Sequence, residues 1–366
     1  MQKNNKEIVH ILVTEHIDTM RYGLGLTNFK KMRELLGLFH GRKLGHTIHT
    51  IWDEMIYIQK WYPTAGALDA KSILFHEHNI DVPKSVIVNY FHTFEPKLVA
   101  QQKIGHLKRR KFWAAGVNDI WAVDQHNKWK LLGLWLHVGV EPFSGHILWI
   151  RVWWSNRILQ LICSYFLDVA DKLSFILLIT QSDSRSENLG VANAQMYMRQ
   201  DLDPALQGTL QHCWMRNKKN IVSEISWSLM RRHMTPGFEH ELWKGVEDDS
   251  YDCHNVLDKL LFWYLFIPWV QAELNHYIKR TNYTIRCADK YKILPTGVLL
   301  NIFDSPHQYG TLNFKVITPP RVIAEARQLY VNPEHEVFQL VPPDFMHYAT
   351  RIYNTLGTPA IIHENI

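Results

Sequence analysis

The stretch "ILLITQSDSRSEN", residues 176–188, joins an apolar run to a polar turn that carries Asp183, Arg185 and Glu187. An apolar run of this length, bounded by turn residues, predicts a central strand from Ile176 to Thr180 that is covered on both faces. Open α/β sheets bind their ligands at the carboxyl ends of such strands. Because Asp is also a common turn residue, Asp183 indicates a functional site only if a second acidic residue lies beside it.

The segments around this strand predict the rest of a sheet. Upstream, three runs with strand character are separated by turn residues, which is typical of an antiparallel meander: "DIWAVDQH", "WKLLGLWLHVGV" and "GHILWIRVWW". An amphipathic helix, "ILQLICSYFLDVADKL", precedes the Ile176 strand, and two helical patterns, "VANAQMYMRQDL" and "EISWSLMRR", follow it. The order of elements predicts an α/β fold with an RNase H-like mixed sheet flanked by helices.

The composition bounds the class of protein. The chain has 366 residues, of which 46% are hydrophobic and 20% charged, as expected of a folded protein with room for two domains. A net charge of +5 permits a polyanionic partner. Four cysteines without a C-x-x-C pair indicate neither a disulfide framework nor a zinc ribbon, so we expect a reducing compartment. The first residues are too polar for a secretory signal, and the run around Pro268 is too short to span a bilayer, so we expect no membrane association.

Upstream of the sheet, the sequence predicts an all-α region that resembles a helix-turn-helix. A helix ends before Pro63, a second carries Leu68, Ile73 and Leu74 on its inner face, and a third begins at Pro83. A plain helical bundle is the alternative. The expected organisation has five parts: an N-terminal helical segment at 1–43, the helix-turn-helix at 44–96, a basic linker at 97–117, the RNase H-like core at 118–305 and an extension at 306–366.

Two groups of residues in this region are candidates for DNA contact. In the third helix, Val82, Val86 and Phe91 are expected inside, whereas Lys84, Ser85 and Asn89 face outward toward bases or phosphates. The linker contributes a basic block without acidic residues, which is either a solvated connection or a phosphate-binding strap. Its residues are Lys108, Arg109, Arg110 and Lys111.

Three carboxylates are candidates for a catalytic site. Asp124 lies on the first strand of the meander, where a charged residue needs a partner or a metal. Asp183 closes the strand after the first helix, and Glu224 lies on a later helix whose same side continues with Arg231 and Arg232. Nearby, His126 is either a partner of Asp124 or an ordinary structural histidine, and Trp227 is expected to be a core residue.

Converging carboxylates have a specific use. Two divalent ions about 3.5 to 4 Å apart activate the attacking oxygen and stabilise the leaving oxygen in phosphodiester displacement. Mg²⁺ prefers carboxylate oxygen and water, and three carboxylates without a cation repel one another. The expected cofactor is therefore Mg²⁺ or Mn²⁺, held by Asp124, Asp183 and Glu224.

Five motifs follow one another along the chain: "GVNDIWAVDQH", "EPFSGHI", "QSDSRSEN", "RNKKNIVSEISWSLMRR" and "NYTIRCADKYKILPTG". With these motifs in order, the chain resembles, over roughly residues 40–310, the integrase-core proteins of fungal transposable elements, within the DDE integrase and transposase superfamily. The resemblance implies a nuclear enzyme that hydrolyses double-stranded DNA at element ends and transfers the freed 3′ end to target DNA, in general as a homo-oligomer. It also implies that Asp124, Asp183 and Glu224 are the metal ligands and that the helix-turn-helix recognises the element ends.

One departure from the family pattern concerns Arg185. The family usually has Gly shortly after the second Asp, where a positive φ or a close backbone approach is needed, and Arg adopts such a conformation only with strain. A salt bridge from Arg185 to Asp183 would also compete with a metal ion. The hypothesis is that Arg185 impairs catalysis, with solvent or phosphate contact as the benign alternative.

Two other functions share these features. A non-catalytic DNA-binding or scaffold protein would keep the fold and lose the metal. An RNA-cleaving nuclease would use the same carboxylates but does not explain a helix-turn-helix, which recognises duplex DNA.

Overall fold

The computed structural model of the chain describes residues 4–39, 41–96, 98–99, 113–215, 220–285, 294–359 and 361. The chain divides into two compact units, Met1–Leu107 and Lys108–Ile366, which we call the helical unit and the sheet unit. The basic block, Lys108 to Lys111, lies outside the described residues, as does Arg286 in the last of the family motifs.

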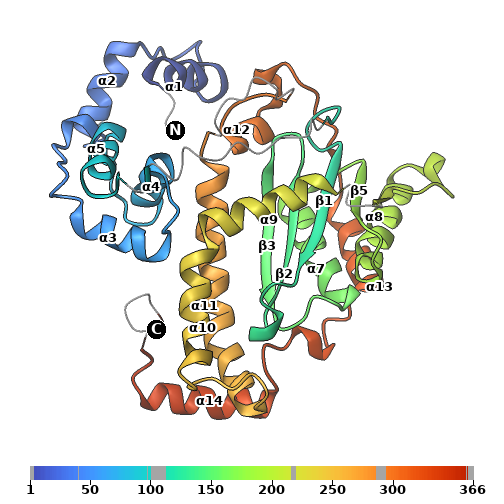
Figure 1. Cartoon of the computed structure of the whole chain (residues 1–366). Helices are drawn as coiled ribbons and strands as arrows, with labels where there is room; N and C mark the ends of the chain where they lie inside the picture. The colour runs from blue at the N-terminus through green and yellow to red at the C-terminus, as the bar shows by residue number, and fades with distance from the viewer. Residues whose placement is uncertain are drawn as a thin grey trace. The chain divides into compact units, whose positions relative to one another are not determined.

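The described part of the helical unit contains five α-helices (Figure 1). The last three are short, as the sequence predicts, and enclose a core that includes Met55, Ile73 and Ile87. Lys84, Ser85 and Asn89 are exposed. The helices are α1 (Asn5–Ile11), α2 (Leu26–Leu35), α3 (Trp52–Trp61), α4 (Ala67–His76) and α5 (Lys84–Phe94).

Two predictions about the inner faces of these helices are wrong. Leu68 is 43% exposed, because it lies two residues from Ala70 and so on the opposite side of α4 from the buried Ile73. Val86 is half-buried, because Ile87 takes the central inward position of α5.

The sheet unit is built on a mixed five-stranded sheet with strand order β3-β2-β1-β5-β6 (Figure 1). The strands β1, β2 and β3 pair antiparallel, so the predicted meander is confirmed, whereas β1, β5 and β6 pair parallel. Helices flank this sheet, which confirms the α/β class. The strands are β1 (Ile120–His126), β2 (Trp135–Glu141), β3 (His146–Trp153), β5 (Ile179–Asp183) and β6 (His212–Met215).

The single strand predicted from Ile176 to Thr180 is divided in the structure. β4 (Phe175–Ile176) pairs instead with β7 (Val316–Ile317), and β5 begins only at Ile179. The side chain of Gln195 explains the break, because its Nε2 donates to the carbonyl oxygens of Leu177 and Leu178, at 2.8 and 3.3 Å. The strand nevertheless ends at Asp183, as predicted.

The two faces of β1 have different neighbours, because successive side chains of a strand point to opposite sides. Trp121 and Val123 belong to the core formed with α7 (Leu159–Leu173) and α8 (Leu189–Leu202). The alternate residues of β1 face α9 (Ile221–His233), which contacts both β1 and β2. This second face carries Asp124 and His126.

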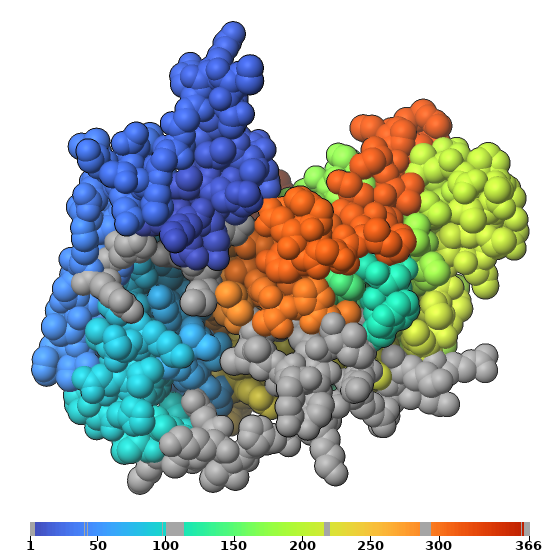
Figure 2. All heavy atoms as spheres, turned by 90° about the horizontal axis from the view of Figure 1, so that it is seen from above, coloured from blue at the N-terminus to red at the C-terminus, as the bar shows by residue number. Residues whose placement is uncertain are grey.

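The segment after residue 305 packs into the sheet unit. Figure 2 shows the orange residues of α12 (Leu299–Asp304) and of the segment that follows it beside green residues of the sheet unit. α13 (Pro320–Tyr330) contacts α7 and α8 and buries Val322, Ile323 and Ala326 in the common core.

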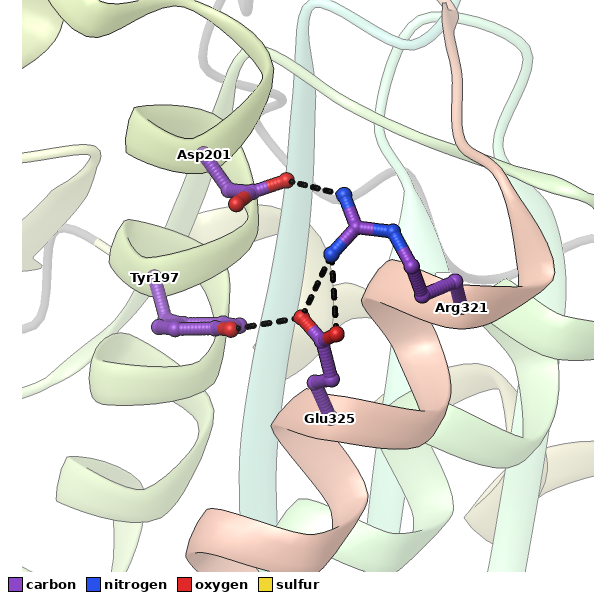
Figure 3. Close-up of polar contacts among 4 residues, drawn as sticks. All are labelled: Tyr197, Asp201, Arg321 and Glu325. Carbon is purple, nitrogen blue, oxygen red and sulfur yellow. Dashed lines mark hydrogen bonds and ion pairs between the residues drawn. The ribbon is translucent and has the colours of Figure 1, made fainter.

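A polar network on the surface joins α13 to α8 (Figure 3). The Arg321 guanidinium lies 2.8 Å from the Glu325 carboxylate and 3.4 Å from that of Asp201, and the Tyr197 hydroxyl donates to Glu325. Exposed ion pairs such as these contribute little stability.

The remaining long elements are α10 (Thr235–Glu247), α11 (Val256–Asn282) and α14 (Pro343–Thr355). α11 runs along β3, and the side chain of Asn282 bonds both the amide and the carbonyl of Ile147. None of the described helices has the length and hydrophobicity needed to cross a membrane.

Candidate active site

Two of the three predicted carboxylates come together at one edge of the sheet. β1 and β5 are parallel neighbours in which Val123 pairs with Ser182, so Asp124 and Asp183 occupy the next pair of positions. Residues paired in adjacent strands point to the same face of the sheet. The two side chains therefore share the α9 face, and the sequence-based expectation that the two strands bring them together agrees with the register.

Asp124 is buried in this position. Its side chain is 8% exposed, and one oxygen, Oδ2, accepts a hydrogen bond of 3.1 Å from the indole Nε1 of Trp227. Burial and then the charge of Asp183 raise the pKa of Asp124 to about 7. When two neighbouring carboxylates are both ionised, their negative charges repel each other. A cation bound between them would relieve this repulsion.

One side-chain oxygen of Asp183 has no hydrogen-bond partner in the part of the chain that the structure describes. This atom, Oδ1, is buried. A buried polar atom of this kind costs free energy unless a donor, water or ion satisfies it. The chemistry of the two Asp side chains and this unsatisfied oxygen fits a hard divalent cation.

The turn after Asp183 is held by Asn188, a residue to which the sequence interpretation assigned no role. Asn188 is fully buried and accepts a hydrogen bond of 2.9 Å from Nε2 of Gln125 on β1. Its own amide lies 3.5 Å from the carbonyl oxygen of Asp183. Asn188 thus ties the turn after Asp183 to β1, the strand that carries Asp124.

Asn220, immediately before α9, anchors that helix over the same two strands. Its Nδ2 donates to the carbonyl of Val123 at 2.9 Å, and its Oδ1 accepts from the side chain of Gln181 at 3.2 Å. Val123 is the residue before Asp124 in β1, and Gln181 lies two residues before Asp183 in β5. Together with the Trp227 bond, this contact fixes α9 against the site.

Glu224 does not join the two Asp residues in the described structure. It is exposed in the first turn of α9, while Ser223 and Trp227, four residues apart, face the sheet. No three His, Cys, Asp or Glu side chains among the described residues are arranged to hold a metal ion. Arg231 and Arg232 are exposed in the last turn of α9.

His126 lies beside the pair on the same face of β1. Its ring centroid is 4.8 Å from that of Trp227, and burial, followed by the charges of Arg231 and Lys128, lowers the pKa of His126 to about 4. The imidazole is therefore neutral at pH 7. The two cations act on His126, and neither forms an ion pair with any described residue.

The predicted strain at Arg185 is absent. Its φ of −116° and ψ of 146° are ordinary extended values. The side chain is exposed, and the expected salt bridge to Asp183 does not occur among the ion pairs of the described residues. Its charge lowers the pKa of Asp124 only as the smallest of the contributions.

Comparison with known proteins does not assign the chain to a family. Neither the protein-family models nor the curated proteins contain a match to this chain.

Proposed function

We propose that the chain is a metal-dependent polynucleotidyl transferase of the DDE type, in which an RNase H-like core cleaves and joins DNA strands. The observation that carries the proposal is the pairing of Asp124 with Asp183 at the end of two adjacent parallel strands, one of them central in the sheet. The antiparallel meander ahead of β5 and the helix α9 over the carboxylates support the RNase H-like interpretation. The proposed reactions, phosphodiester hydrolysis and strand transfer, are those that the resemblance to the integrase-core family implies.

In this proposal Asp124 and Asp183 hold Mg²⁺ or Mn²⁺, and Glu224 is the third ligand implied by the family motif. Bound divalent ions would supply activation of the attacking oxygen and stabilisation of the leaving oxygen. The chain's own residues fix the positions of the carboxylates. Asn188 and Asn220 fix the two strands and α9, and the neutral His126 and the ring of Trp227 close the buried side of the site.

The substrate would be double-stranded DNA. Arg231, Arg232 and Lys128 would contact its phosphates, each contact adding salt-dependent affinity. In the helical unit, α4 and α5 are joined by a turn in which Asn79 has a φ of 58°, and α5 exposes Lys84, Ser85 and Asn89 from its first turns. A helix-turn-helix contacts base edges with the N-terminal residues of its second helix, which supports this role for α5. Nuclear localisation and assembly into a homo-oligomer are parts of the same proposal.

A second candidate function is a DNA-binding scaffold without catalysis. The exposed position of Glu224, apart from the Asp pair, favours it. The two functions differ in whether the carboxylates bind a divalent cation, since both predict salt-dependent DNA binding.

Nicking of supercoiled plasmid tests the proposal. The full chain is incubated with Mn²⁺ or Mg²⁺ beside Asp124→Asn, Asp183→Asn and a control, Asp249→Asn. The control removes the same charge from an exposed residue at a positive φ that Asn also adopts. We expect metal-dependent nicking by the native chain and the control, and at least about a thousandfold loss, roughly 4 kcal/mol, in both site variants. Equal nicking by all four proteins, or none by the native chain, would overturn the enzymatic proposal.

A further inference from the structure

Trp227 was expected to be an ordinary core residue, yet its one polar atom is directed at the carboxylate pair. The side chain is 5% exposed, and its Nε1 donates to Oδ2 of Asp124 at 3.1 Å. The indole ring also packs against His126, with ring planes inclined by 40°. Trp227 therefore contacts both residues that β1 directs toward α9 at this end of the strand.

A single hydrogen bond of this kind has a geometric consequence for Asp124. A carboxylate has two oxygens and turns about its side-chain torsions unless a contact holds one of them. With Oδ2 held by the indole, the orientation of the remaining oxygen, Oδ1, is set by the position of α9. That helix is in turn anchored over β1 and β5 by Asn220.

The bond is also selective for the charged form of the carboxylate. An N–H donor aimed at a carboxylate oxygen favours ionisation, and the indole can donate but cannot accept. Besides the Trp227 bond, the Asp124 carboxylate accepts a hydrogen bond from the backbone amide of Gln125, and carboxylate oxygens held in place in this way are the ligands that a hard divalent cation prefers.

We infer that Trp227 is a positioning residue, which holds Oδ2 of Asp124 so that the other oxygen faces, together with Asp183, a divalent cation. The inference rests on the proposed function, because it assumes that the Asp pair binds such a cation. It assigns the indole N–H a role in cation affinity that a core residue would not have.

Another indole–carboxylate bond in the sheet unit provides a matched control. Trp129 is fully buried, and its Nε1 donates to Oε1 of Glu239 at 2.8 Å. Glu239 is not among the proposed ligands. Trp129→Phe therefore removes the same kind of bond as Trp227→Phe, with a similar loss of packing, but leaves Asp124 untouched.

The experiment measures Mn²⁺ affinity from the electron paramagnetic resonance signal of free Mn²⁺, with the full chain and no DNA. Asp124→Asn is the reference for the site itself. Removing a group that orients a metal ligand typically weakens affinity by about 10- to 100-fold. We expect a loss in this range for Trp227→Phe and less than about twofold for Trp129→Phe.

The outcomes separate the inference from the function on which it rests. If Asp124→Asn binds Mn²⁺ as the native chain does, the proposed function fails, and the inference with it. If Asp124→Asn loses binding while Trp227→Phe and Trp129→Phe both keep the native affinity, the proposed function stands and the inference is overturned.

A second measurement decides the matter if Trp227→Phe does not fold. In the native chain the indole proton of Trp227 can be assigned by nuclear magnetic resonance through its proximity to the His126 ring. The inference predicts that this resonance shifts saturably as Mg²⁺ is added, while the Trp129 indole resonance stays in place. An unmoved Trp227 resonance under Mg²⁺ concentrations that shift other signals of the site would contradict it.

Discussion

The sheet unit contains two buried carboxylates, Asp124 and Glu141, which look alike by burial and acidity but differ in their partners. Burial raises the pKa of each to about 7. Glu141, at the end of β2, accepts hydrogen bonds from the amides of Phe143 and Ser144 and from the Ser144 hydroxyl. Asp124 accepts a bond from the Trp227 indole and one from the backbone amide of Gln125, and it faces a second carboxylate.

A raised pKa therefore does not by itself identify a functional acid. Glu141 closes the tight turn between β2 and β3, and its oxygens are satisfied by that turn. The Asp pair is unsatisfied, since Oδ1 of Asp183 has no partner among the described residues. A surplus of negative charge and an unsatisfied oxygen, rather than burial, distinguish the site that would gain from a cation.

The largest stability effect is expected at Glu141. Glu141→Ala leaves two buried amides and a hydroxyl without their acceptor, and each unsatisfied donor costs about 1–3 kcal/mol. We expect the free energy of unfolding to fall by about 3–5 kcal/mol in urea-induced unfolding. A change below about 1 kcal/mol would mean that the turn does not depend on the carboxylate. Glu141 could then no longer be called a structural acid in contrast to Asp124.

Asp124→Asn should act in the opposite direction. The amide keeps an oxygen for the Trp227 indole but removes the repulsion from Asp183. At pH 8 without divalent cations, we expect the free energy of unfolding to rise by about 1 kcal/mol, the equivalent of roughly one pKa unit. Destabilisation as large as that of Glu141→Ala would show that Asp124 is a structural acid instead.

The pH dependence follows from the same two groups. A carboxyl whose pKa is about 4 in the unfolded chain and about 7 in the folded one binds more protons when folded, so its stability contribution is present below pH 4. That contribution is lost as the pH rises from about 4 to 7. We expect the free energy of unfolding of the native chain to decline across this window, and Asp124→Asn to decline less steeply. Identical slopes would refute the raised pKa of Asp124.

The smallest effect is expected at Arg185. Its side chain is exposed and its backbone is unstrained, so solvent and salt screen its charge from the carboxylates. Arg185→Gly should change Mn²⁺ affinity by less than about threefold. A tenfold or larger gain would restore the hypothesis that this residue impairs the site.

Local patterns explain which features could be predicted from the sequence. The meander, the helix α7 and the position of Asp183 at the end of its strand follow from hydrophobic periodicity and turn residues. The pairing of Asp124 with Asp183 was expected from the RNase H-like fold that the order of elements matches, because the order of strands in a sheet cannot be read from the sequence itself. The family motifs added Glu224, whose position in the structure is apart from that pair.

The remaining features depend on contacts between distant residues. Gln195 divides the apolar run by bonding the carbonyls of Leu177 and Leu178, which no local pattern shows. Asn188, Asn220 and Trp227 act through partners 63, 97 and 103 residues away in the chain. A polar residue bound to a distant strand looks, in sequence, like any turn, cap or core residue.

The most direct test of the central claim is the effect of Mg²⁺ on folding stability. A cation that binds only the folded chain stabilises it by about 2.7 kcal/mol at a concentration 100 times its Kd. The native chain should unfold at a higher urea concentration with Mg²⁺ than without, and Asp124→Asn should show no such difference. Equal stabilisation of both proteins would contradict the claim that the Asp124–Asp183 pair is a divalent cation site.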